Sequence, residues 1–166
     1  GLTNPTIAAL QERMAALEGG VGAIAWASGH AAQLTAFHNL LQAGDEFIAA
    51  KKLYGGSINQ FKNSFKQYGW QVKFVDIDNA AEIKAAINHK TKFIFAESLS
   101  NPEGAVADIK SLADLAHQHQ LPLLIDNTIA TPALVRPIEY GADLVISSTT
   151  KFLTGNGSAV GGVIID

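Results

Sequence analysis

Five short groups carry the side chains most suited to chemistry, and each group comes shortly after an apolar run. They are Ser28-Gly29-His30, Tyr54-Gly55-Gly56, residues 97–101, Asp126-Asn127-Thr128 and Ser148-Thr149-Thr150-Lys151. Together they hold an amine, a carboxylate, a phenol, several hydroxyls and a glycine placed to open a helix. An amine can form a Schiff base with an aldehyde, and the free N–H groups at a helix start can bind phosphate.

The elements that must position these groups alternate between helix and strand. Apolar periodicity and capping residues predict helices at 5–18, 29–41, 57–68, 80–88 and 109–119. Apolar or β-rich runs predict strands at 22–27, 46–50, 71–77, 92–96, 121–125, 143–147 and 160–165. Strands that are apolar on both faces and separated by helices are typical of a parallel sheet covered on both sides. We therefore expect an α/β fold with a mostly parallel sheet sandwiched by helices.

Ligands of an open parallel sheet bind beyond the carboxyl ends of its strands, so the five groups are expected to gather along one edge. Each group alone has an ordinary explanation. A lysine after a strand is usually a solvated loop residue, Asp126 could cap a turn, and Ser28 could simply begin a helix. The set as a whole fits one kind of chemistry, that of pyridoxal phosphate.

Pyridoxal phosphate needs a lysine for its aldehyde and an acid for its pyridinium nitrogen. Lys151 is predicted to form the Schiff base, and Asp126 to keep the ring nitrogen protonated. Tyr54 is predicted to stack on the ring, and Asn101 to bond the ring hydroxyl. The predicted phosphate ligands are the helix start at Ser28, Gly29 and His30 and the hydroxyls of Ser148 and Thr150. Lys151, Tyr54 and Asp126 are the predicted catalytic residues.

Composition excludes several other classes of ligand and location. The net charge of -3 and the pI near 5.9 provide no basic surface for nucleic acid. No apolar run reaches the roughly 18 residues of a membrane span, and there is no cysteine for disulfides or thiolate metal sites. His117 and His119 lie two apart on a predicted helix and so point to different faces, and no metal site is predicted. A cytoplasmic protein is expected.

The chain resembles the cysteine/methionine-metabolism family of pyridoxal-phosphate enzymes, which has the aspartate-aminotransferase fold (fold type I). The resemblance runs from Asn4 to Asp166. The motifs that carry it are Leu17-Glu18-Gly19-Gly20, Ala27-Ser28-Gly29-His30-Ala31-Ala32, Leu53-Tyr54-Gly55-Gly56, Asp126-Asn127-Thr128, Arg136-Pro137-Ile138-Glu139-Tyr140-Gly141-Ala142-Asp143 and Ser147-Ser148-Thr149-Thr150-Lys151. The match implies the same roles for Lys151, Asp126 and Tyr54, and places Gly29, His30, Ser148 and Thr150 at the phosphate.

The resemblance is closer to the branch of the family that acts on O-acetylhomoserine, through Ser28-Gly29-His30-Ala31-Ala32-Gln33 and residues 161–166. It implies γ-replacement by sulfide, which gives homocysteine and acetate. Cystathionine γ-synthase, cystathionine lyase and methionine γ-lyase activities are the alternatives. Methionine γ-lyases typically carry a cysteine where this chain has Gly56, which weighs against that alternative. Asn156 also departs from the family, which usually has histidine there.

Family members carry a Tyr-x-Arg segment that reaches a neighbouring subunit, and a smaller C-terminal domain that holds the substrate carboxylate. Neither is found here, and the chain opens at Gly1-Leu2-Thr3 without methionine. We therefore expect residues 1–166 to be the cofactor-binding large domain, as a piece of a homo-oligomeric enzyme that acts on an amino acid. The isolated piece is expected to be inactive.

Two readings from other classes also stay open. Gly155-x-Gly157 with Gly161-Gly162 would be the support for a nucleotide-binding module, although the spacing misses G-x-G-x-x-G. The other reading is a non-catalytic interaction module.

Overall fold

The computed structural model describes residues 4–166, so the opening Gly1-Leu2-Thr3 lies outside the described residues. A seven-stranded sheet runs through the molecule in the order β1-β7-β6-β5-β4-β2-β3. Its strands are β1 (Ala23–Trp26), β2 (Glu46–Ala50), β3 (Gln71–Val75), β4 (Thr91–Glu97), β5 (Leu123–Asp126), β6 (Leu144–Ser147) and β7 (Gly162–Ile165). All seven lie within or beside runs that the sequence predicts as strands.

Strand β7 is the one antiparallel strand among the described residues. It pairs antiparallel with β6 on one side and with β1 on the other, while every other neighbouring pair is parallel. The carboxyl ends of the other six strands therefore lie at one edge of the sheet, and the start of β7 joins them there. The predicted α/β fold with a mostly parallel sheet is confirmed.

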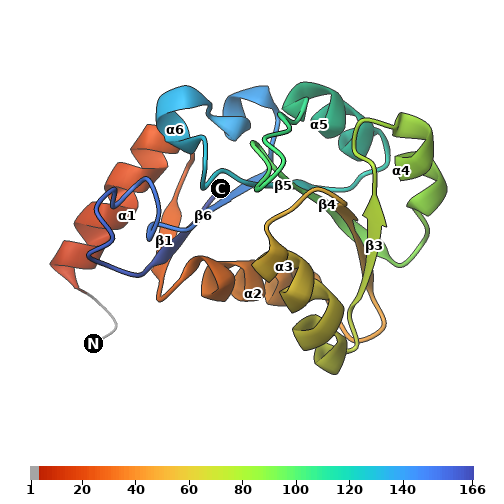
Figure 1. Cartoon of the computed structure of the whole chain (residues 1–166), viewed down its shortest axis with the longest axis horizontal. Coiled ribbons are helices and arrows are strands. Elements are labelled where there is room, and N and C mark those ends of the chain that lie inside the picture. The colour runs from red at the N-terminus through yellow and green to blue at the C-terminus, as the bar shows by residue number, and fades with distance from the viewer. Residues whose placement is uncertain (1–3) are drawn as a thin grey trace.

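Helices cover both faces of this sheet, as Figure 1 shows. The helices α2 (Gly29–Leu40) and α3 (Gly55–Asn59) lie on one face, and α4 (Ala80–Ala86), α5 (Ile109–Gln118) and α6 (Thr131–Leu134) lie on the other. Helix α1 (Pro5–Glu18) packs against β1 and β7 at one end of the sheet. Its N-cap Asn4 accepts hydrogen bonds from the N–H groups of Thr6 and Ile7, as the Asn-Pro start predicts. No described helix is both long enough and apolar enough to cross a membrane.

A cluster of six fully buried phenylalanines fixes α2 beneath the sheet. Phe37 of α2 packs edge-on against Phe93 of β4 and Phe47 of β2, with ring centroids 4.6 and 5.0 Å apart. The other members are Phe61, Phe65 and Phe95. Buried aromatic rings contribute a large share of core stability through both area and geometry. The cluster holds α2 firmly, and the start of α2 reaches the polar edge of the sheet.

Two regions differ from the elements that the sequence predicts. The predicted helix at 57–68 begins earlier, at Gly55, and changes from α-helix to a π-helix (Gln60–Ser64) and a 3-10 helix (Phe65–Tyr68). Helix α6 and a 3-10 helix at Pro137–Tyr140 were not predicted, because a few residues give too little periodicity to recognise.

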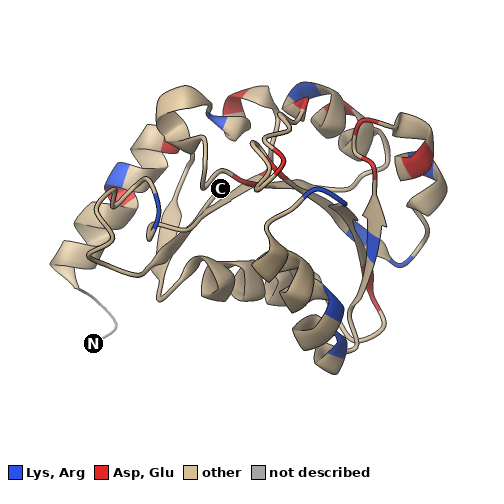
Figure 2. Ribbon diagram, viewed as in Figure 1, with Lys and Arg blue, Asp and Glu red and all other residues tan. Residues whose placement is uncertain are grey.

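Charges are unevenly spread over the molecule. In Figure 2 they gather around β3, α4 and α5, while the loop between β6 and β7 carries a single charged residue, Lys151.

On α1, the apolar side chains of Ile7, Leu10 and Leu17 are each more than 40% exposed, although Met14 on the same helix is buried.

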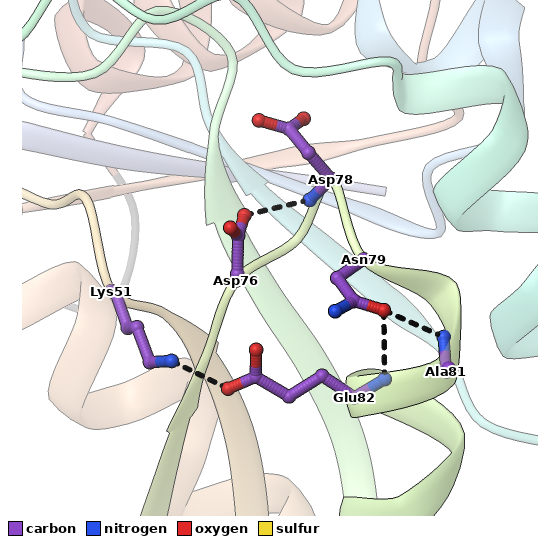
Figure 3. A network of polar contacts seen from close by, with 6 residues as sticks. All are labelled: Lys51, Asp76, Asp78, Asn79, Ala81 and Glu82. Atoms are coloured by element: carbon purple, nitrogen blue, oxygen red, sulfur yellow. Dashed lines mark hydrogen bonds and ion pairs between the residues drawn. The ribbon is translucent and has the colours of Figure 1, made fainter.

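The segment that leads from β2 to Tyr54 begins beside the start of α4, as Figure 3 shows. Lys51 pairs with Glu82 of α4, with Nζ and Oε1 2.5 Å apart. Asn79 caps α4 by accepting hydrogen bonds from the N–H groups of Ala81 (3.1 Å) and Glu82 (3.2 Å). The pair is partly exposed and so contributes little to stability. The backbone N–H of Lys51 donates to the carbonyl oxygen of Val75 (2.9 Å), and this bond holds the chain where it leaves β2.

A buried polar network joins α1 to the strand that ends at Asp126. Asn127 is fully buried, and its Nδ2 donates to Glu18 Oε1 (3.0 Å) and to the carbonyl oxygen of Val135 (2.9 Å). Its Oδ1 accepts from the hydroxyl of Ser98 (2.7 Å). Burial raises the pKa of Glu18 to about 7, against the opposing effects of the Asn127 bond and the charge of Arg136. Asn127, the residue after Asp126, is therefore held by hydrogen bonds to three separate segments.

Glu18→Gln is predicted to remove a pH-dependent loss of stability. Because the pKa of Glu18 is raised in the folded protein, its favourable contribution is complete below about pH 4.5 and is lost as pH rises through 7. Glutamine stays neutral and keeps an acceptor for Asn127. At about pH 8 the variant should be more stable than wild type, by on the order of 2 kcal/mol. The difference in melting temperature should shrink towards pH 5, and a difference independent of pH would contradict the argument.

Candidate functional site

A pocket of about 350 Å³ opens at the edge of the sheet where the parallel strands end. All nine residues predicted from the sequence line it, although they come from five separate segments. They are Ser28, Gly29, His30, Tyr54, Asn101, Asp126, Ser148, Thr150 and Lys151. A pocket of this volume suits a small organic ligand.

The start of α2 forms one wall. Ser28 is the N-cap, and its hydroxyl accepts from the N–H of Ala31 at 3.0 Å. The N–H groups of Gly29 and His30 precede the first helical bond, so they are available to an anion. A Cβ on Gly29 would lie 2.7 Å from Cβ of Ser148. Glycine is therefore required for the helix start to approach the end of β6 this closely.

Asp126 forms the floor. Its Oδ1 accepts from the N–H of Thr128 (3.0 Å), and its Oδ2 accepts from the amide of Gln33 (3.1 Å). Burial raises the pKa of Asp126, although the bonds from Thr128 and Gln33 act in the opposite direction. A cationic ring nitrogen beside this carboxyl group would favour its ionised form. A carboxyl group in this position can pair with a basic ligand atom in the pocket.

The loop after β6 brings hydroxyls and an amine to the pocket, next to the start of α2. The backbone N–H of Ser148 donates to the hydroxyl of Thr128 at 2.8 Å. The hydroxyl of Thr150 accepts from the N–H of Gly161 (3.0 Å) and lies 3.2 Å from its carbonyl oxygen. Thr150 therefore ties this loop to the start of β7, in addition to lining the pocket. Lys151 is exposed and follows directly.

Tyr54 and His30 form an aromatic side of the pocket. Their ring centroids are 5.9 Å apart and their planes are inclined by 30°. Burial lowers the pKa of His30, with the charge of Lys151 acting in the same direction and that of Asp126 against it. A Cβ on Gly56 would lie 2.4 Å from Tyr54 Cε1 and 2.8 Å from His30 Cε1. The two rings thus occupy the space that a side chain at position 56 would need.

Glu97 is a pocket residue to which the sequence assigned no role. It is the last residue of β4, is 6% exposed, and pairs in register with Asp126 of β5. Burial raises the pKa of Glu97 to about 7, and the nearby charge of Asp126 adds to this. The available signal was a charged residue directly after four buried apolar residues, 93–96.

Gln33, Ser57 and Thr128 also line the pocket without having been predicted individually. Gln33 is 2% exposed and bonds both Asp126 and the hydroxyl of Ser57 (3.1 Å). A polar residue one helical turn after Gly29 was a weak sign of this contact, since residues i and i+4 share a helix face.

The donor set fits pyridoxal phosphate. The pocket presents an amine for an aldehyde, a carboxyl group for a ring nitrogen, helix N–H groups for a phosphate and a phenol ring for a flat face. In the described part of the chain, no three His, Cys, Asp or Glu side chains are grouped to hold a metal ion. Gly155 and Gly157 lie in the loop before β7, not at a strand-to-helix turn, which argues against the nucleotide-binding reading.

Comparison with known proteins gives consistent relatives. The chain is 50% identical over 166 residues to an O-acetyl-L-homoserine sulfhydrylase of Corynebacterium glutamicum, covering 99% of this chain and 38% of the relative. It is 45% identical to an O-acetyl-L-homoserine sulfhydrylase of Leptospira meyeri, covering 99% of this chain and 37% of the relative. A homocysteine/cysteine synthase of Saccharomyces cerevisiae is 43% identical, with 98% of this chain and 37% of the relative covered. The chain thus spans less than two fifths of these relatives.

A solved structure from Campylobacter jejuni matches with a TM-score of 0.97 at 39% identity, over 99% of this chain and 41% of its own length. It is described as an O-acetylhomoserine (thiol)-lyase and carries a pyridoxyl-lysine monophosphate. The family model described as "Cys/Met metabolism PLP-dependent enzyme" matches residues 2–166. This chain belongs to that family of pyridoxal-phosphate-dependent enzymes of cysteine and methionine metabolism.

Proposed function

We propose that this chain is the cofactor-binding large domain of a cytoplasmic, homo-oligomeric enzyme that replaces the acetate of O-acetylhomoserine by sulfide. The observation that carries the proposal is the convergence of the Lys151 amine, the Asp126 carboxyl group and the α2 N-terminus on one pocket. The names of the relatives, sulfhydrylase and homocysteine/cysteine synthase, support the substrate class.

The residues that line the pocket have separate roles in this proposal. Lys151 would link to the cofactor aldehyde, and Asp126 would hold a proton at the ring nitrogen. Gly29 and His30 would bind the phosphate through their N–H groups, with the hydroxyl of Ser148 beside them. When bound, pyridoxal phosphate supplies an electron sink for the substrate's α carbon. Tyr54 would cover the ring face, and Asn101 would contact the ring hydroxyl.

The Lys151 amine is also placed to move protons during the reaction. With substrate bound, the Lys151 amine would carry protons between the α and β carbons of the substrate. In the proposed reaction, acetate would leave the γ carbon as the anion with the bonding electrons, and hydrosulfide would bond that carbon through its sulfur to give homocysteine. Gly56 weighs against methionine γ-lyase activity, because the Tyr54 and His30 rings leave no room there for the cysteine that those enzymes typically carry.

The remaining parts of the active site would come from chain outside these residues and from a second subunit. The exposed apolar side chains at the α1 end support such a covering, since Val21 is 97%, Leu134 80% and Phe152 64% exposed. Isolated residues 1–166 would then bind the cofactor weakly and would not turn over substrate.

Lys151→Ala in the full-length protein tests the function. We expect borohydride reduction with cofactor, followed by peptide mapping, to label Lys151 in the wild type. The variant should lose turnover of O-acetylhomoserine with sulfide by about 10³-fold or more. Lys90→Ala, which changes an exposed lysine near the opposite edge of the sheet, is the matched control and should keep full turnover. A label on another lysine, or no turnover by the wild type, would refute the proposal.

Asp126→Asn should keep the fold but weaken catalysis. Asparagine can retain the contacts with Thr128 and Gln33 because the Gln33 amide can rotate to present its oxygen. It cannot keep a charged partner for the ring nitrogen, so kcat should fall about 100-fold or more. Steady-state kinetics beside the melting temperature checks this, and an unchanged kcat would remove Asp126 from its assigned role.

Gly56→Ala should disturb the ring face without unfolding the protein. The new methyl group would displace the Tyr54 and His30 rings, because their Cε1 atoms lie only 2.4 and 2.8 Å from its position. Cofactor affinity should fall by about tenfold, a loss of about 1.4 kcal/mol. Gly55→Ala is the control, since a methyl group there meets no atom within 4 Å. Equal cofactor affinity in the two variants would count against Tyr54 as the stacking residue.

A further inference from the structure

Glu97 links two loops that carry separate pocket residues. Its Oε1 accepts from the backbone N–H of Tyr54 at 2.7 Å, and its Oε2 accepts from the backbone N–H of Asn101 at 3.1 Å. Tyr54 follows β2, whereas Asn101 lies four residues beyond the end of β4. One carboxyl group therefore sets the separation between the loop that carries the phenol ring and the loop that carries the amide.

The position of Glu97 is unfavourable for a carboxylate on electrostatic grounds. It is nearly fully buried, and Asp126 lies in register on the neighbouring strand. Burial and a like charge both disfavour ionisation, and a neutral side chain would avoid that cost. The Glu97 carboxyl group offsets this cost by accepting the hydrogen bonds from the two backbone N–H groups. An acceptor with two oxygens is needed to satisfy both N–H groups at once.

We propose that Glu97 is a positioning residue of the cofactor site, whose carboxyl group holds Tyr54 and Asn101 at the separation that the pyridoxal ring requires. The inference rests on the proposed function only for the placement of the ring between these loops. Glu97 acts through the two backbone segments, not by contact with the reacting atoms.

Glu97→Gln in the full-length protein is the direct variant. A glutamine side chain keeps the size but has one acceptor oxygen, so one of the two N–H groups would face an NH₂ group. Glu97→Asp keeps both oxygens but is one methylene shorter, so it cannot span the same two donors. The matched control is Glu46→Gln. Glu46 is also a buried strand glutamate, 8% exposed, but it lies at the start of β2 and bonds Lys73 and Asn88.

The readouts concern the cofactor and require no substrate. Apo-protein is titrated with pyridoxal phosphate to obtain Kd, and the visible circular dichroism of the saturated protein reports how the ring is held. We expect both Glu97 variants to raise Kd by about tenfold and to reduce the visible band of the saturated protein. Glu46→Gln should keep the wild-type Kd and band, whatever its effect on the apo-protein melting temperature.

Wild-type Kd and band intensity in the Glu97 variants would overturn the proposal. So would a lowered melting temperature with a full wild-type band at saturation, because this would show a purely structural role. If Glu97→Gln does not fold, Glu97→Asp decides between these outcomes. Failure of the proposed function is distinguishable, since it would appear as wild-type protein that binds pyridoxal phosphate but does not turn over O-acetylhomoserine and sulfide.

Discussion

Two neighbouring parallel strands, β4 and β5, both end at an acidic residue, and the sheet register places Glu97 directly beside Asp126. Buried carboxyl groups need hydrogen-bond donors, because the penalty of burial is otherwise uncompensated. Each oxygen of the pair obtains one from a different segment. Tyr54 and Asn101 donate to Glu97, and Thr128 and Gln33 donate to Asp126. Satisfying this pair fixes the backbone on two sides of the pocket and orients a helix residue beneath it.

The other side of the pocket depends on close packing between backbone segments. The start of α2 approaches the end of β6 so closely that position 29 must be glycine. Strand β7 is antiparallel to both of its neighbours, so it begins at the edge where the other strands end. There Gly161 bonds the hydroxyl of Thr150. The start of α2 and the loop that carries Lys151 are therefore held together by the sheet itself. Rigid placement of this kind reduces the entropy lost when a ligand is bound.

The polar site lies beside an end of the molecule that exposes several large apolar side chains. Helix α1 and the segments around it expose apolar side chains, while the charged residues gather around β3, α4 and α5. Asn127 and Glu18 carry a buried network from the pocket floor to α1. Helix α1 therefore contacts, through Glu18, the residue next to Asp126.

Much of this architecture follows from local patterns in the chain. Alternating apolar runs and helical periodicity predict the seven strands and the main helices, because burial on both faces of a sheet leaves a strong signal. Polar groups directly after those strands predict the pocket, since parallel strands share one carboxyl edge. The nine predicted residues all line it for this reason. The short helix α6 and the change to a π-helix after Asn59 had no comparable periodic signal.

The tertiary structure decided the contacts between side chains that are distant in sequence. Glu97 meets the N–H of Tyr54 across 43 residues, Gln33 meets Asp126 across 93, and Glu18 meets Asn127 across 109. The sequence fixes residue types but not the sheet register or the helix placement that brings such partners within 3 Å or so. The direction of β7 depends likewise on its pairing with both β1 and β6. The sequence by itself therefore determined the class of fold and the chemical character of the site, whereas long-range packing determined which groups hold that site in shape.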